Sequence, residues 1–91
     1  MGQLSINRAL LNEFAPRVSP EAIVLYLILA DRAEEDRTLE MSVKDMCNAL
    51  GKSESYVKKY LSEMAREGMI ERERRQAADG GNLSNKYTLL I

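Results

Sequence analysis

Hydroxyl and amine side chains recur at helical spacing in residues 53–67. If this segment is a helix, its outward face holds Ser55, Lys59, Ser62 and Arg66, spaced by four, three and four residues. An α-helix fits the major groove of B-DNA, where Lys donates hydrogen bonds to guanine and Ser reaches several bases. The candidate DNA-binding residues here are Lys52, Ser53, Ser55, Tyr56, Lys58, Lys59, Ser62 and Arg66. Taken alone, the pattern also fits the solvated face of any amphipathic helix.

A second group of cations lies in residues 69–91. Arg74, Arg75 and Lys86 flank a turn-rich stretch, AADGGNLS. Arg keeps its charge and is attracted to a narrow minor groove, so these three residues are candidates for contact with the DNA backbone or minor groove. The alternative is that ERERR, with Glu71 and Glu73, is a self-paired cross-strand face that keeps a hairpin soluble.

Two short helices with apolar stripes precede these cations. Ser42 and Asp45 form a pair like a capping box at the start of a helix over 42–50, and Gly51 ends it in a tight turn. Ser53 caps the next helix, which runs to Gly68. The apolar stripes are Val43, Met46, Cys47 and Leu50 in the first helix and Val57, Tyr60, Leu61 and Met64 in the second. A three-residue connection between two such helices is helix-turn-helix spacing.

An earlier helix is predicted from about 20 to 35. Ser19 caps it, Pro20 occupies its first turn, and Ile23–Leu29 is apolar at every position. A helix that is apolar all round is buried on more than one side, so either residues 4–14 or a second subunit should cover it. Residues 7–14 are expected to form a short helix that ends at Pro16, with its apolar face made by Leu10, Leu11 and Phe14.

Strand patterns complete the chain. Residues 38–41 alternate as a short strand, and two further strands on either side of the Gly-Gly turn predict a β-hairpin, with Tyr87, Leu89 and Ile91 on one face. The order is helix, short strand, helix, turn, helix, hairpin. We expect one domain over 19–91, with residues 1–18 as an N-terminal extension.

Composition narrows the possible functions. The chain has 91 residues, a net charge of −1, one cysteine and no histidine. Residues 1–51 hold five basic and eight acidic residues, hence −3, whereas residues 52–91 hold eight and six, hence +2. Nothing resembles a nucleophile motif, a phosphate loop or a metal site, so we expect no enzyme, no cofactor, no metal and no small-molecule ligand. The longest apolar run is too short to span a bilayer, which favours a cytoplasmic protein.

These elements resemble the winged helix-turn-helix family. SPEAIVLYLILADRAEED looks like its first helix, MSVKDMCNALGKSESYVKKYLSEMAREGMIERE like its helix-turn-helix and the start of its wing, and NLSNKYTL like its closing strand. The resemblance covers about residues 19–91 and points to DNA-binding domains of plasmid and phage replication initiators and related bacterial regulators. It implies an α+β, mainly helical fold with a three-helix core and a C-terminal hairpin wing. Such domains often carry Arg or Lys where this chain has Glu54 and Ser55.

Two functions follow from these expectations. In the first, a homodimer binds double-stranded DNA in transcription control or replication initiation, with the helix at 53–67 in the major groove and the wing at 69–91 on the backbone or minor groove. In the second, the domain is a protein–protein interaction adaptor with little affinity for DNA, which the negative net charge favours. Continuous positive potential over the second helix and the wing distinguishes the first from the second.

Overall fold

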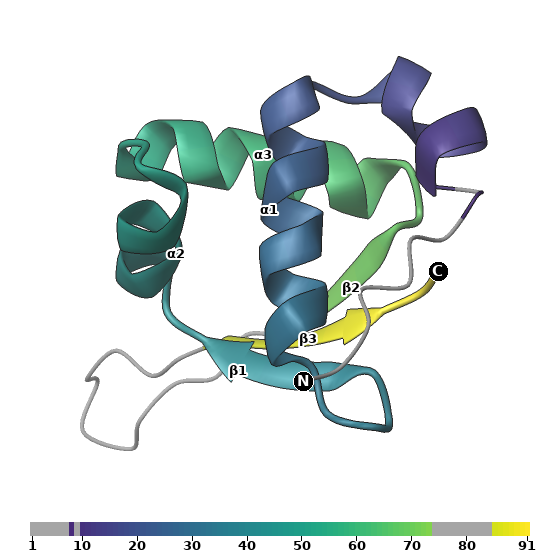
Figure 1. Cartoon of the computed structure of the whole chain (residues 1–91). Coiled ribbons are helices and arrows are strands. Elements are labelled where there is room, and N and C mark those ends of the chain that lie inside the picture. Colours follow the sequence, from purple (N-terminus) through teal and green to yellow (C-terminus); the bar gives the residue numbers. More distant parts are fainter. Residues whose placement is uncertain (1–7, 9, 74–84) are drawn as a thin grey trace.

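A computed structural model of the chain describes residues 8, 10–73 and 85–91, and within them the helices stand above a small sheet (Figure 1). The elements are η1 (Leu10–Phe14), η2 (Ala15–Arg17), α1 (Pro20–Arg32), β1 (Thr38–Met41), α2 (Val43–Leu50), α3 (Glu54–Arg66), β2 (Ile70–Glu73) and β3 (Asn85–Leu89). The predicted order of helix, strand, two helices and a strand pair is confirmed, and the fold is α+β and mainly helical.

The turn between α2 and α3 forms as the sequence predicts. The Ser42 hydroxyl accepts a hydrogen bond of 3.0 Å from the Asp45 N–H and so caps α2. Gly51 has φ 75°, a left-handed conformation that glycine adopts without steric cost, and its N–H donates to the Cys47 carbonyl at 2.8 Å. The chain therefore reverses within three residues, and α3 begins against α2.

The predicted side-chain caps at Ser19 and Ser53 are wrong, although both residues stand at helix starts. The Ser19 hydroxyl and N–H donate instead to the Glu63 carboxylate of α3, at 3.0 and 3.2 Å. A charged acceptor forms the stronger hydrogen bond, so this long-range contact replaces the local one. The Ser53 hydroxyl lies 3.3 Å from that of Ser55 and makes no capping bond.

The first long helix is shorter than predicted, and the segment before it is differently built. Helix α1 ends at Arg32 instead of about 35, because Ala33 is already extended, with φ −70° and ψ 146°. Pro16 does not end the preceding helical segment but lies within η2, where a proline in the first turn lacks no required hydrogen bond. Leu10 is buried at 1% exposure, whereas Leu11 is 53% exposed, so the three predicted apolar residues do not share one face.

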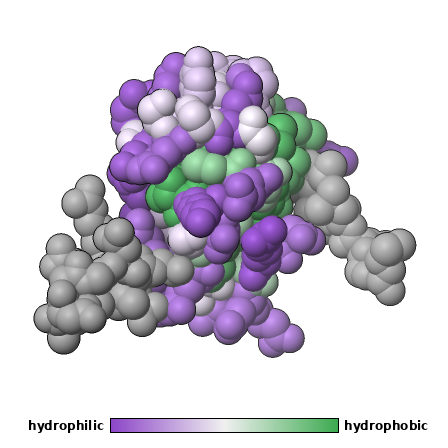
Figure 2. Space-filling model, turned by 90° about the vertical axis from the view of Figure 1, so that its left-hand side faces the viewer, coloured by the Kyte–Doolittle hydropathy of each residue, from purple (hydrophilic) through white to green (hydrophobic). Residues whose placement is uncertain are grey.

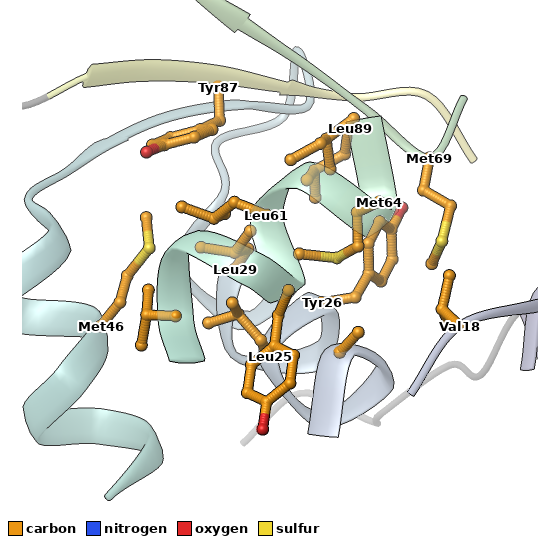
Figure 3. Close-up of a cluster of buried hydrophobic side chains, with 14 of the residues drawn as sticks. Val18, Leu25, Tyr26, Leu29, Met46, Leu61, Met64, Met69, Tyr87 and Leu89 are labelled. Atoms are coloured by element: carbon orange, nitrogen blue, oxygen red, sulfur yellow. The ribbon is translucent and has the colours of Figure 1, made fainter. Parts of the chain in front are cut away.

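The sheet is antiparallel in the order β1-β3-β2. Its inner face packs on the helices through buried residues from all three strands, which are Leu39, Met41, Ile70, Tyr87 and Leu89. Figure 3 shows Tyr87 and Leu89 of this face beside Leu61 and Met64 of α3 and Leu29 of α1. The methionines predicted to fill the core do so, since Met41, Met46, Met64 and Met69 are all buried.

Two neighbouring leucines test how the N-terminal segment packs. We expect Leu10→Ala to lower the free energy of unfolding by about 2–5 kcal/mol, because it opens a cavity in the hydrophobic core. The same change at Leu11 should cost less than about 0.5 kcal/mol, because that side chain is half in solvent. Chemical denaturation monitored by circular dichroism measures both. Equal losses for the two variants would contradict the packing of η1.

Candidate nucleic-acid interface

Helix α3 presents opposite faces to the core and to solvent. Its apolar stripe is fully inside, with Val57, Tyr60, Leu61 and Met64 at 0 to 3% exposure. The prediction that Tyr60 belongs to the core is confirmed. The opposite face carries the exposed residues Ser55, Lys59, Ser62 and Arg66. The structure thus brings these four predicted site residues together on one free helix face, which we call the α3 outer face.

On one side of the α3 outer face an aromatic pair holds a lysine. The Tyr56 ring is 51% exposed and stacks on the Tyr60 ring, with 6.2 Å between centroids and 25° between planes. The Lys52 ammonium lies 5.7 Å from the centroid of Tyr56, a cation–π distance. Because Tyr60 is anchored in the core, it fixes the Tyr56 ring, and Tyr56 in turn limits where the Lys52 charge can lie.

On the other side, a glutamate pairs with a lysine. Lys58 Nζ lies 2.7 Å from Glu54 Oε1, one turn earlier, and both side chains are more than half exposed. The hydrogen bond from Lys58, together with its charge, holds the pKa of Glu54 below its ordinary value. The Arg66 pairing with Glu67 is looser, at 3.6 Å. Lys58 is therefore the cation of this helix whose charge is most directly compensated.

The strand register separates the charges of the wing. Residues opposite one another on antiparallel strands point to the same side of a sheet. Arg72 pairs with Tyr87, whose side chain is buried on the helix side, so Arg72 points toward α3. Glu73 pairs with Lys86, and Lys86 also pairs with Glu40 of β1, so these three lie on the outer side. Glu71, two residues before Glu73, lies there too.

This register changes the predicted picture of the wing in two ways. Arg72 does not share a face with Glu71 and Glu73, whereas Glu73 lies opposite Lys86. The alternative of a self-paired ERERR face stays a prediction, because its last two arginines are not among the described residues. Lys86 lies on the outer side of the sheet between two glutamates, apart from the α3 outer face. Arg74 and Arg75 lie outside the described residues. Sequence reasoning did not select Arg72, although its period-2 spacing from the buried Ile70 is the signal that finds it.

A cleft of about 560 Å³ separates α3 from the wing. Its lining residues are Val43, Lys58, Leu61, Ser62, Arg72, Asn85 and Tyr87. Figure 2 views the molecule from the side of Figure 1 on which α2 lies, and shows hydrophobic residues flanked by hydrophilic ones. The lining of the cleft is mixed in the same way, with the apolar Val43 and Leu61 beside the cationic Lys58 and Arg72.

Residues 8, 10–73 and 85–91, which the structure describes, contain neither a metal-binding cluster nor a membrane-spanning helix. No group of three His, Cys, Asp or Glu residues there could hold a metal ion. None of the helices in that part of the chain is long and apolar enough to cross a membrane.

Three solved structures share this arrangement of helices, sheet and wing. A Rep–DNA complex matches with a TM-score of 0.72 and 19% identity, over 96% of this chain and 73% of that chain. The chain has the winged helix-turn-helix fold. The N-terminal domain of a DNA-binding protein matches with a TM-score of 0.71 and 17% identity, over 96% and 72% of the two chains. A possible transcriptional regulator from Methanosarcina mazei Go1 matches at 0.64 and 13%, over 92% and 65%.

No protein-family model and no curated protein matches the sequence of this winged-helix chain. The identities to the three structures are below 20%, so the likeness concerns the fold and not individual residues. The fold predicted from the sequence is confirmed. The DNA-binding residues stay predictions, now with known positions for all but Arg74 and Arg75.

The Glu54–Lys58 pair makes a prediction about titration. We expect Lys58→Ala to raise the pKa of Glu54 toward its ordinary value, because the variant loses both the hydrogen bond and the positive charge. NMR titration of the side-chain carboxyl carbons measures this pKa. Asp36 is the internal control, because hydrogen bonds from Thr38 lower its pKa and Lys58 does not. An unchanged Glu54 pKa would show that the pair does not persist in solution.

Proposed function

We propose that this domain binds double-stranded DNA with the α3 outer face in the major groove. The observation that carries the proposal is the complete separation of α3 into a buried apolar stripe and an exposed face of Ser55, Lys59, Ser62 and Arg66. A helix packed in this way is rigid, and its small serines let the backbone approach base edges closely. Lys59, at the centre of the face, is the residue best placed to read a base.

The two sides of the α3 outer face support the same function. Tyr56 is exposed and held by Tyr60, so its ring is available for a thymine methyl or its hydroxyl for a phosphate. The first turn of α3 has no side-chain cap, which leaves its N–H groups available to a phosphate near Ser53. Lys52 adds a positive charge at the same end of the helix.

Four cations support DNA binding over the adaptor function, although the carboxylates of Glu54 and Glu67 pair with Lys58 and Arg66 on the same helix. Lys52, Lys59, Arg66 and Arg72 all lie on or beside the α3 outer face. The carboxylates of Glu40, Glu71 and Glu73 are on the outer side of the sheet, turned away from α3. Glu63 is engaged by Ser19 at the junction with α1. A chain with a net charge of −1 can therefore offer DNA a locally cationic surface.

We also propose that the domain acts as a homodimer through α1. Val24 is 48% exposed, and Leu27 and Ile28, which lie one turn further along, are only partly buried. No charged residue occurs between Glu21 and Asp31, so two copies of this surface meet without repulsion. In Figure 1 α1 lies in front of α3, and none of the described helices and strands covers its near side. A two-fold dimer reads palindromic half-sites separated by about one helical turn.

Transcription control and replication initiation are the biological roles proposed for such a dimer. The similar structures include a Rep–DNA complex and a possible transcriptional regulator, and both roles require a sequence-specific duplex reader. A bacterial, plasmid- or nucleoid-associated setting in the cytoplasm fits the resemblance of the sequence. Neither a cofactor nor a small-molecule ligand enters this proposal.

Selection from random duplexes, followed by sequencing of the bound fraction, tests DNA reading. An enriched two-fold motif supports the proposal and gives the half-site spacing. With this motif in hand, Lys59→Ala should weaken binding by about 1–3 kcal/mol and relax preference at one base position. Binding to random duplex should fall much less. The control is Arg32→Ala, which removes the same charge from the exposed end of α1.

The result would favour the adaptor function if the wild-type protein bound no duplex even at low salt. Equal losses on the selected and random duplexes for Lys59→Ala would contradict a base-reading role for this residue.

Disruption of the α1 surface tests the dimer. Val24→Asp should convert the dimer to a folded monomer, because it places two carboxylates at the centre of the contact while the side chain is already half in solvent. Sedimentation equilibrium over a range of concentrations measures the change. Leu90→Asp is the matched control, since Leu90 is 49% exposed outside α1. A monomeric wild-type protein at high concentration would contradict the dimer.

A further inference from the structure

Two cations from different elements reach the same cleft. Lys58 comes from α3 and Arg72 from β2, and both line the 560 Å³ cleft between helix and wing. They are 14 residues apart in sequence, and only the register of β2 against β3 turns Arg72 toward α3. Among the residues that the structure describes, no carboxylate pairs with Arg72. The cleft therefore holds one uncompensated guanidinium and one ammonium that is shared with Glu54.

The cleft also offers neutral hydrogen-bond donors. Asn85 lines it, and one N–H of its amide points to the Tyr87 hydroxyl at 3.3 Å, which leaves a second N–H. The Ser62 hydroxyl lies on the helix side of the same cleft. Val43, Leu61 and Tyr87 line the cleft as well. Two cations and two neutral donors around an opening suit an oxyanion with several acceptor oxygens, which is the chemistry of a phosphate group.

We infer that this cleft is a phosphate subsite in which Lys58 and Arg72 together bind one phosphate of the DNA backbone. The inference rests on the proposed function and adds to it the contact between the recognition helix and the wing. The subsite lies beside Ser62 of the α3 outer face, so a strand whose bases meet that face has its backbone at the cleft. Arg72 becomes a DNA-contacting residue that positions the duplex, and Asn85 and Ser62 supply hydrogen bonds.

Glu54 opposes this contact. Its carboxylate holds Lys58 at 2.7 Å in the free protein, so the ammonium must exchange one anion for another when DNA arrives. Both side chains are more than 60% exposed, so the exchange does not require the core to open. Glu54 therefore lowers affinity specifically through Lys58. This effect accounts for an acidic residue at a position where related DNA binders often carry a cation.

The salt dependence of binding to a fixed duplex tests the subsite. Lys58→Ala, Arg72→Ala and the double variant are compared with wild type between about 50 and 200 mM salt. If both residues bind one phosphate, the double variant should lose about one unit of the log–log slope. A loss of about two units would assign the residues to separate phosphates, and no loss would exclude the cleft from DNA contact. Either result overturns the shared subsite. Circular dichroism establishes that each variant is folded.

Glutamate variants test whether Glu54 competes with a DNA phosphate for Lys58. Glu54→Gln should tighten duplex binding several-fold in the wild-type background and leave it unchanged when Lys58 is already Ala. Glu71→Gln is the matched control, because it removes the same charge from the outer side of the sheet. Equal gains from Glu54→Gln and Glu71→Gln would mean that net charge alone acts, which contradicts a specific role of Glu54.

Titration with inorganic phosphate at constant ionic strength distinguishes the source of the phosphate. Weak or no saturation, with the slope loss above, supports the DNA backbone. Saturable binding that Lys58→Ala and Arg72→Ala abolish, without any change in the DNA slope, would assign the cleft to a free phosphate ligand and overturn the inference as stated. Failure of the wild-type protein to bind any duplex would overturn the proposed function itself, and the phosphate titration would still report on the cleft.

Discussion

The burial of one side of α3 is the constraint on which the remaining structure depends. Val57, Tyr60, Leu61 and Met64 have almost no exposed surface, and they contact α1, α2 and the sheet together. Rotation of α3 by even one position would move part of this stripe into solvent, at roughly 1.5–3 kcal/mol for each large side chain exposed. The core therefore fixes the direction of the α3 outer face. The polar residues of that face are held in position by the buried apolar residues on the opposite side of the helix.

In the wing, too, a buried residue determines where the charged side chains point, because successive side chains of a β-strand point to opposite faces. Ile70 enters the core directly after α3, which sets the side to which Arg72 points. Glu71 and Glu73 must then point the other way, where Lys86 lies between Glu73 and Glu40. A run of alternating charges thus becomes a cation beside α3 and a largely acidic outer sheet surface. The burial of Ile70 thus determines the side of the sheet to which each charged side chain of β2 points.

The sequence was sufficient to predict the elements whose causes are local. The helix-turn-helix spacing, the Ser42 cap, the Gly51 turn and the stripe on α3 depend on residues within a few positions of one another, and all are as predicted. The contacts that it did not predict join distant parts of the chain. The Ser19 hydroxyl bonds Glu63 instead of capping its own helix, and the direction of Arg72 is set by the partner strand. Leu11 looked equivalent to Leu10 because no local rule distinguishes adjacent leucines in an irregular helical segment.

For the proposed DNA interface, net charge is a poor guide, because it averages over faces that one duplex would not meet together. The Debye length at physiological salt is about 8 Å, so a phosphate at the cleft interacts chiefly with nearby Lys58, Arg72 and Glu54. Carboxylates on the far side of the sheet or at the end of α1 are screened from it. The charges within that distance decide the local potential, and among the described residues Glu54 is the carboxylate that pairs with a cation of the cleft. In the proposed mode of binding, one acidic residue at the start of α3 tunes the affinity for DNA without any change in the fold that positions it.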